Sequence, residues 1–226
     1  MENTPLPNAT PKASTYQNTD AFLSSCETSL INASDAAIAP LLTARGYTPA
    51  IIAAKLTELA TLKTLVASQK KEYGEQFAAT EEYTKAVDLL HPEYMDHLAL
   101  ARVAFKTDTA AKTGLDLKGK RAQSESGYTS QALLFYNGVL GNPAYKTKLA
   151  AFGITEAQLQ TGKTGYTALA TKSANKTKES GEAQAATQAR DKALDTFSTW
   201  FSDFKVVATI ALNKTPQLKE KLGWKE

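Results

Sequence analysis

Residues 71–80 read KEYGEQFAAT, and residues 178–187 read KESGEAQAAT. The two stretches lie 107 residues apart, and the same offset aligns 42–115 with 149–222 without a gap, giving 24 identical residues in 74 positions. Glycines coincide as well as alanines and lysines, so a biased composition alone does not explain the match. Self-similarity at a fixed spacing is the signature of a tandem repeat, and we expect a duplicated unit of about 100 residues.

The composition predicts that this unit is helical. Alanine occurs 37 times and leucine 25 times, whereas valine and isoleucine together occur 12 times. Alanine and leucine favour helices, and β-branched residues favour strands. Hydrophobic residues make up 42% of the chain, which is too many for a disordered protein. No apolar stretch approaches the ~18 residues that span a bilayer, so we expect no transmembrane segment.

Each repeat contains the same helix-boundary signal. Gly46 and Gly153 are each followed two residues later by a threonine, Thr48 and Thr155. Glycine adopts the left-handed conformation that closes a helix, and a threonine hydroxyl caps the next one. Gln158 stands at the capping-box spacing from Thr155. We therefore expect one long helix to begin after Thr48 and another after Thr155.

Gly74 and Gly181 leave two alternatives open within these long helices. Glycine interrupts helices, so each residue can form a hairpin turn. Neither has a Pro, Asn or Asp neighbour, however, and Gly74 continues a seven-residue series of small side chains beside a series of large ones. We favour a continuous helix in which Gly74 lets a partner helix approach closely. The small series is Ala53, Ala60, Ala67 and Gly74, and the large series begins Ile52, Leu59, Val66 and Tyr73.

Two sequence features bear on the continuity and the packing of the long helices. Pro92 follows His91 and predicts a kink or a restart, because proline lacks the backbone N–H and crowds the preceding turn. Between Leu169 and Leu194 the second helix has only small and polar side chains. We expect that stretch to protrude, to cover the first repeat only through alanines, or to move.

Together these patterns predict an all-α protein, an elongated antiparallel helical bundle built from two tandem pseudo-repeats with two long helices. We expect a flexible N-terminal tail at 1–18, a first helical unit at 19–117, a linker at 118–128 and a second helical unit at 129–226. The two units should pack as one body.

Residues 152–155 (FGIT), 185–191 (AATQARD) and 216–223 carry a resemblance. They are similar to a group of uncharacterised bacterial proteins with long alanine-rich helices, in which an Ala-Ala-Thr motif follows a Gly-hydrophobic-Thr start. The resemblance covers most of 42–223. It implies the helical repeat fold and no particular activity.

The charges of the chain bear on the kind of partner that it binds. The chain has 26 basic and 23 acidic residues, and the two signs are mixed, so we expect no nucleic-acid partner.

Residues 1–15 lack the basic start and apolar core of a cleavable signal peptide, which leaves the localisation unknown, with the cytoplasm as the default. The single cysteine, Cys26, fits a buried core position.

Residues 91–97, HPEYMDH, hold the candidate metal ligands. Glu93 and His97 are four residues apart, so both lie on one helix face and can hold a divalent ion between them. Two ligands do not complete a site. The competing interpretation is a helix start, with His91 as its cap and Glu93 near the positive end. We predict no cofactor, and Glu93 and His97 are the metal candidates.

The aromatic residues near the short helices of the second repeat are the candidate interaction residues. Most of them should be core, and the remainder can form an interaction surface. These candidates are Tyr128, Phe135, Tyr136 and Trp224.

No set of residues has the spacing of a catalytic site. We therefore predict a non-enzymatic structural or protein-interaction module, a scaffold or self-assembling unit whose partner is another protein or the chain itself. The alternative is a helical bundle that binds a small molecule or a metal, and an enzyme belongs to this class. Its site would lie near His91, Glu93 and His97. Membrane-active helices are a third interpretation, which the polar stretch 170–193 disfavours.

Overall fold

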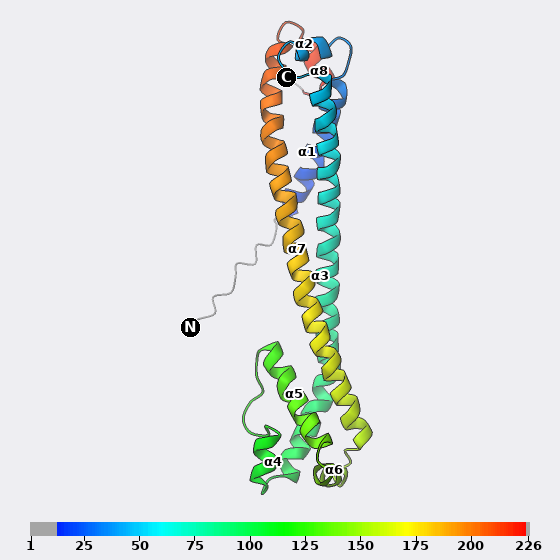
Figure 1. The fold of residues 1–226 in the computed structure, drawn as a ribbon, viewed down its shortest axis with the longest axis vertical. Coiled ribbons are helices and arrows are strands. Elements are labelled where there is room, and N and C mark those ends of the chain that lie inside the picture. The colour runs from blue at the N-terminus through cyan, green and yellow to red at the C-terminus, as the bar shows by residue number, and fades with distance from the viewer. Residues whose placement is uncertain (1–12, 225–226) are drawn as a thin grey trace. The chain divides into compact units, whose positions relative to one another are not determined.

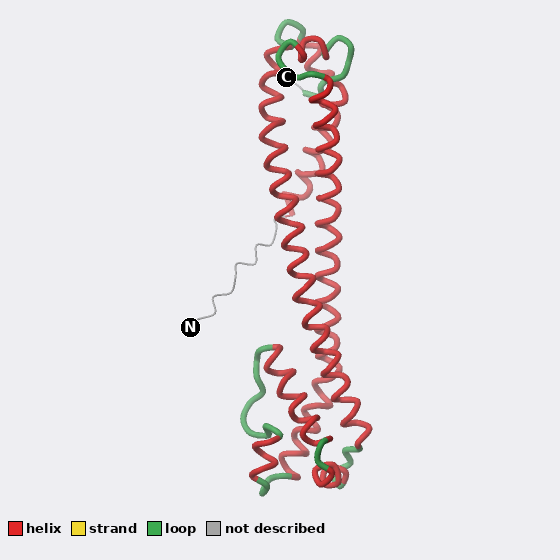
Figure 2. Tube along the Cα trace, in the orientation of Figure 1, coloured by secondary structure: helices red, strands yellow, loops and turns green. Residues whose placement is uncertain are grey.

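The computed structural model describes residues 13–224, and every regular element in that range is a helix (Figures 1 and 2). Because 81% of the chain is helical and no strand occurs among the described residues, the all-α prediction is confirmed. Of the predicted tail, residues 1–12 lie outside the described range, whereas the first helix already begins at Ala13. The described helices are α1 (Ala13–Asn32), α2 (Ala39–Thr43), α3 (Pro49–Ala104), α4 (Thr109–Gly114), α5 (Glu125–Leu140), α6 (Pro143–Ala150), α7 (Glu156–Ala211) and α8 (Pro216–Lys221).

The predicted starts of the long helices are confirmed. Gly46 and Gly153 have φ angles of +90° and +82°, the left-handed conformation that closes the preceding turn. Thr48 Oγ1 accepts a hydrogen bond from the N–H of Ile51, at 3.4 Å. In the second repeat, Thr155 Oγ1 accepts from the N–H of Gln158 at 3.2 Å, and Gln158 Oε1 accepts from the N–H of Thr155 at 2.8 Å. The latter pair is the expected capping box.

Gly74 and Gly181 lie inside α3 and α7, so the continuous helix is confirmed over the hairpin turn. The predicted close approach at Gly74 is wrong, because a Cβ atom added there would meet nothing within 4 Å. Close approach occurs elsewhere, where Gly162 packs against the ring of Tyr136 and Gly165 packs against Leu90.

Pro92 also lies inside α3, which continues to Ala104, so a helix restart at this proline is wrong. A proline inside a helix costs about 3 kcal/mol, because it removes a backbone hydrogen bond and crowds the preceding turn. Pro92 is exposed, whereas Tyr94 and Leu98 beyond it are fully buried. Burying a large apolar side chain contributes roughly 1.5–3 kcal/mol, so these two residues together offset the proline.

The helices group into two compact units. Unit 1 contains the chain up to Lys70 and from Ala186 onwards. It therefore includes α1, α2, α8, the first part of α3 and the last part of α7. Unit 2 is Lys71–Ala185, with α4, α5, α6 and the remainder of both long helices. The units therefore cut across the predicted sequence units 19–117 and 129–226, and the duplication itself stays a prediction.

The core of unit 1 lies between α1, α3 and α7. The ring of Phe201 on α7 meets that of Phe22 on α1 edge to face, with centroids 6.0 Å apart, and Phe204 meets Tyr47 at 5.3 Å. The buried residues of this core are Leu23, Cys26, Leu30, Ala33, Ile38, Leu42, Ile52, Leu59, Leu62, Val66, Phe197, Phe201, Phe204, Ala208, Leu212 and Leu222.

Two further contacts describe unit 1. Arg190 on α7 donates to the side chain of Gln69 on α3 at 3.3 Å, whereas Tyr47, just before α3, meets Trp200. Tyr47 precedes Gln69 in the sequence, whereas its partner Trp200 follows Arg190, so the two helices are antiparallel here.

Cys26 is fully buried, as expected, and this burial raises the pKa of its thiol to about 12.

The core of unit 2 lies between α3, α5 and α7, with α4 and α6 at one end (Figure 1). Gln76 on α3 bonds Ser180 on α7, and Glu82 pairs with Lys172, so the long helices are antiparallel in this unit as well. The buried residues are Tyr83, Tyr94, Leu98, Ala101, Ala104, Phe105, Ala111, Leu115, Leu117, Ala132, Phe135, Tyr136, Val139, Leu149, Ile154, Leu159, Tyr166 and Leu169.

The polar stretch of α7 packs on α3 through small side chains and ion pairs. Ala183 is buried, with 2% of its surface exposed. Lys172 lies 2.8 Å from Glu82, and the ammonium group of Lys176 stands 4.7 Å from the centre of the Tyr83 ring. This stretch therefore lies against α3, but not only through alanines, because lysine contacts contribute as well.

Glycine-to-alanine substitutions should separate the two kinds of helical glycine. Gly74→Ala and Gly181→Ala should each raise the free energy of unfolding by about 0.5–1 kcal/mol, because alanine loses less backbone entropy and has open space for its methyl group. Gly162→Ala should lower it by about 1–3 kcal/mol, because the methyl group overlaps the buried ring of Tyr136. Urea unfolding followed by circular dichroism measures both. Equal effects at Gly74 and Gly162 would contradict this packing.

Candidate functional site

Two histidines and four tyrosines come together in unit 2, where α3, α5 and α7 meet. We call this group the tyrosine–histidine cluster, and it consists of His91, Tyr94, His97, Tyr128, Tyr136 and Tyr166. It includes both histidines of the sequence.

Hydrogen bonds join the cluster in two separate chains. His91 Nδ1 lies 2.7 Å from the hydroxyl of Tyr128, which lies 3.0 Å from the hydroxyl of Tyr166. His97 Nδ1 lies 3.2 Å from the hydroxyl of Tyr136. The two histidines therefore bond different tyrosines, and their imidazole rings do not form one site.

Tyr94 stands at the centre of the cluster. Its ring lies 5.4 Å from that of Tyr166 and 5.9 Å from those of Phe135 and Tyr136, measured between centroids. Such edge-to-face and tilted pairs stabilise a core beyond the area that they bury. The hydroxyl of Tyr94 accepts a hydrogen bond from Arg121 at 3.3 Å.

Burial disfavours charge on the buried members of the cluster. It raises the pKa of Tyr136 and of Tyr166 well above the ordinary tyrosine value, because a phenolate would lose its hydration. Burial also lowers the pKa of His97, although the nearby carboxylates of Glu93 and Asp96 oppose the shift. Burial therefore disfavours a charge on Tyr136, Tyr166 and His97.

The structure brings the metal candidates together as a pair. Glu93 Oε1 lies 3.8 Å from His97 Nε2, and Tyr136 holds the other ring nitrogen of His97. His91 is not a helix cap, since it lies within α3, and it bonds Tyr128. Two ligand atoms fall short of the three or more that protein metal sites provide, so a metal at Glu93 and His97 stays a prediction.

A different group of carboxylates comes together in unit 2. Oxygens of Glu72, Glu179 and Glu182 lie within 4.8 Å of one another. Lysines compensate their charge, since Lys71 lies 3.5 Å from Glu72, and Lys178 lies 3.0 Å from Glu179 and 2.8 Å from Glu182. Sequence reasoning missed this group, although both repeats carry the Lys-Glu pairs that form it.

The structure places two of the four candidate interaction residues in a core and leaves the other two half-buried. Phe135 and Tyr136 are buried in the core of unit 2, and Tyr128 is half-buried in the cluster. Trp224 is half-buried in unit 1, where its indole N–H donates to Ser29 Oγ at 2.9 Å. This bond ties the segment after α8 to α1.

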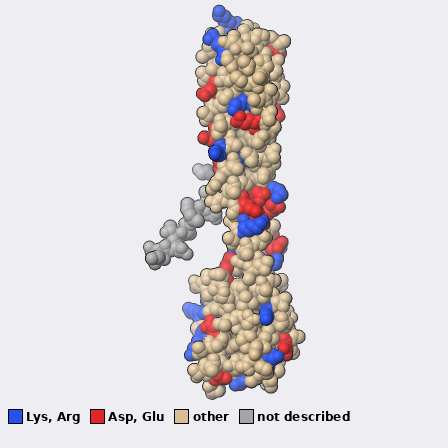
Figure 3. All heavy atoms as spheres, in the orientation of Figure 1, with Lys and Arg blue, Asp and Glu red and all other residues tan. Residues whose placement is uncertain are grey.

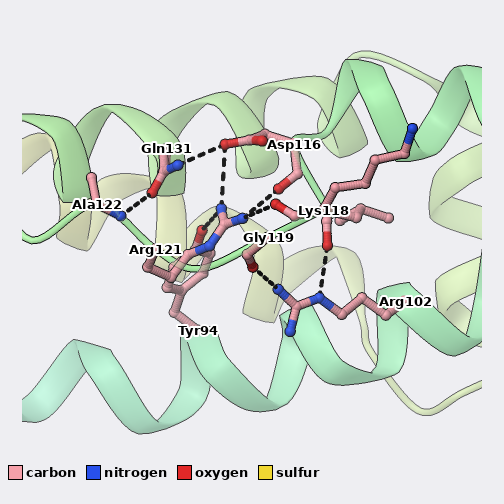
Figure 4. Close-up of polar contacts among 9 residues, drawn as sticks. Tyr94, Arg102, Asp116, Lys118, Gly119, Arg121, Ala122 and Gln131 are labelled. Carbon is pink, nitrogen blue, oxygen red and sulfur yellow. Dashed lines mark hydrogen bonds and ion pairs between the residues drawn. The ribbon is translucent and has the colours of Figure 1, made fainter.

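The loop between α4 and α5, residues 115–124, is held by two arginines (Figure 4). Arg102 on α3 donates to the carbonyl of Leu117 at 2.7 Å and to that of Gly119 at 2.9 Å. Arg121, within the loop, donates to the carbonyls of Asp116 at 2.7 Å and Lys118 at 3.1 Å. We call this set of bonds the loop latch.

The loop latch continues onto α5. The side chain of Gln131 donates to Asp116 Oδ2 at 2.8 Å and accepts from the N–H of Ala122 at 2.7 Å. The side chain of Arg121 is only 8% exposed. The polar linker that the sequence predicted at 118–128 is therefore a fastened loop up to Ser124, and α5 begins at Glu125.

No family model matches this chain, and neither the curated proteins nor the solved structures contain a match. The resemblance to bacterial proteins with alanine-rich helices therefore stays a prediction.

The buried histidine should make stability depend on pH. The pKa of His97 is lower in the folded protein than in the unfolded chain, so the unfolded chain takes up its proton first as the pH falls. The free energy of unfolding should therefore decline below about pH 6.5, at a slope of at most ~1.4 kcal/mol per pH unit from this group. In His97→Phe the decline between pH 7.5 and 5.5 should be smaller, as measured by urea unfolding.

The matched control is His91→Phe, which removes the exposed histidine of the same helix. It should keep the wild-type decline. If His97→Phe retains the full decline, the buried imidazole is not its source.

Proposed function

We propose that the chain acts as a non-enzymatic helical module that binds a protein partner or a second copy of itself. The observation that carries this proposal is a strip of exposed apolar side chains on α3, within unit 2. Leu89 is 79% exposed and Val103 is 58% exposed. They stand two heptads apart, so they share one helix face, and the exposed residues Pro92 and Ala99 lie between them in sequence. We call these four residues the outer strip of α3.

Unit 1 has apolar side chains at a matching position. On α7, Val206 is 61% exposed and Ile210 is 52% exposed, one helical turn apart. Ile210 follows Val103 by the repeat offset of 107 residues, and Asp203 follows Asp96 by the same offset. Single exposed apolar residues are ordinary on a protein surface. Their recurrence at one register in both long helices supports a binding role.

The boundaries of the helices support the duplication on which this proposal draws. α3 and α7 are each 56 residues long, and they begin at Pro49 and Glu156, the repeat offset apart. α4 and α8 begin at Thr109 and Pro216, which differ by the same offset. A repeated module that presents equivalent faces is typical of scaffold proteins.

The use of polar groups also supports a binding module. Both histidines and Arg121 make their hydrogen bonds within the protein. On the face seen in Figure 3, basic and acidic side chains lie beside each other. No helix in the part of the chain that the structure describes is long and apolar enough to cross a membrane. Apolar contact with another protein therefore fits the surface best.

Substitution of the outer strip tests the proposal. Leu89→Lys with Val103→Lys should abolish both self-association in light scattering and retention of proteins on the immobilised chain, because lysines do not bury in an apolar interface. The thermal midpoint should stay within a few degrees of wild type, since both positions are exposed.

The matched control places the same two charges on another face of α3, at Thr80 and Thr84, which are also exposed. This control should bind as the wild type does. A wild-type chain that is strictly monomeric and retains nothing, or an outer-strip variant that binds as well as the control, contradicts the proposal.

A further inference from the structure

Neither half of the chain contains a core of its own. We divide the described chain at the loop between α4 and α5, into a first half (13–117) and a second half (125–224). In unit 1 the first half supplies residues from Leu23 to Val66, and the second half supplies Phe197 to Leu222. In unit 2 the first half supplies Tyr83 to Leu117, and the second half supplies Ala132 to Leu169.

The contacts between the halves are the central contacts of each core. In unit 1 the rings of Phe201 and Phe204 from the second half meet Phe22 and Tyr47 from the first. In unit 2, Tyr94 from the first half is surrounded by aromatic rings of the second, with Tyr166 the nearest. Separated halves would expose these rings to water, so each half needs its complement to fold.

The loop of residues 115–124 is the covalent connection between the halves. It starts at Leu115, which packs against Gly138 near the end of α5, and it ends at Ser124, which caps the start of α5. The stretch of α5 between these points rises about 21 Å. A loop of this length reaches up to roughly 30 Å, so it closes within one chain.

We infer that the surface that each half presents to the other is also an intermolecular binding surface, and that its partner is a second copy of this chain. In the exchanged dimer the first half of one copy pairs with the second half of the other copy. Every buried contact between the halves is kept, because the complement has the same sequence. Exchange of identical elements is a low-cost route to dimers and is governed by the connecting loop.

The length of the loop permits closure within one chain, and the loop latch holds it in that form. Arg121 bonds carbonyls within the loop, and Arg102 ties the loop to the end of α3 (Figure 4). Gln131 fastens both sides of the loop to α5. These bonds favour closure within one chain. The inference goes beyond the proposed function, since it uses the buried surface and does not depend on the outer strip of α3.

Deleting residues 116–122 tests the exchange in the full chain. The deletion leaves only Gln123 between Leu115 and Ser124, a span of at most about 7 Å. Closure within one chain then becomes impossible, since the α5 stretch to be spanned rises about 21 Å. We expect a helical dimer by light scattering and circular dichroism. The control replaces the same seven residues with glycine and serine, and it should keep the oligomeric state of the wild type, because the length of its loop alone lets one chain close.

A folded monomer from the deletion variant overturns the exchange, and so does a variant that unfolds or aggregates while the glycine–serine control, which also lacks the buried Leu117, stays folded. A second measurement tests the premise separately. A protease site placed at residues 118–121 of the full chain is cut after folding. The two fragments should stay together in gel filtration with their helicity retained. Fragments that separate, with either one still folded, overturn the claim that the halves need each other.

Discussion

The antiparallel pairing of α3 with α7 is the constraint on which the rest of the structure depends. In unit 1, Lys55 near the start of α3 meets Trp200 near the end of α7, and in unit 2 Tyr94 near the end of α3 meets Tyr166 near the start of α7. The short helices then cover faces that this pairing has already brought together. Because both cores draw on both halves of the chain, the stability of each unit depends on contacts between residues more than 100 positions apart in places, such as Gln69 and Arg190.

Positions 107 residues apart in the sequence have different side chains in the two units. Phe201 and Phe204 make the core of unit 1 apolar, and the residues 107 positions earlier are Tyr94 and His97. In unit 2 a hydroxyl and an imidazole therefore occupy buried positions, and each needs a hydrogen-bond partner. Arg121 and Tyr136 supply these partners. The hydrogen bonds of the tyrosine–histidine cluster thus satisfy polar groups at buried positions of unit 2.

Local features of the fold could be predicted from the sequence, because local chemistry determines them. Gly46 and the capping box of Thr155 act within one helical turn, and both were found where expected. The restart expected at Pro92 was wrong, because the lost backbone bond was considered without the burial of Tyr94 beyond it. The close approach expected at Gly74 was wrong for a related reason. A series of small residues identifies a helix face without bulky side chains, but it does not show whether another helix packs against that face.

The partner of each apolar face could not be predicted, since a helical period identifies a buried face without naming what covers it. The candidate interaction residues Phe135 and Tyr136 are core for this reason. The measurement that tests the pairing most directly is a cross-link between α3 and α7 in a Cys26→Ala chain. A short thiol cross-linker should join Gln76→Cys to Ser180→Cys within one molecule, because these side chains are 3.4 Å apart. Preferential cross-linking of Gln76→Cys to a cysteine at Ala170, about 15 Å further along α7, would contradict the antiparallel register.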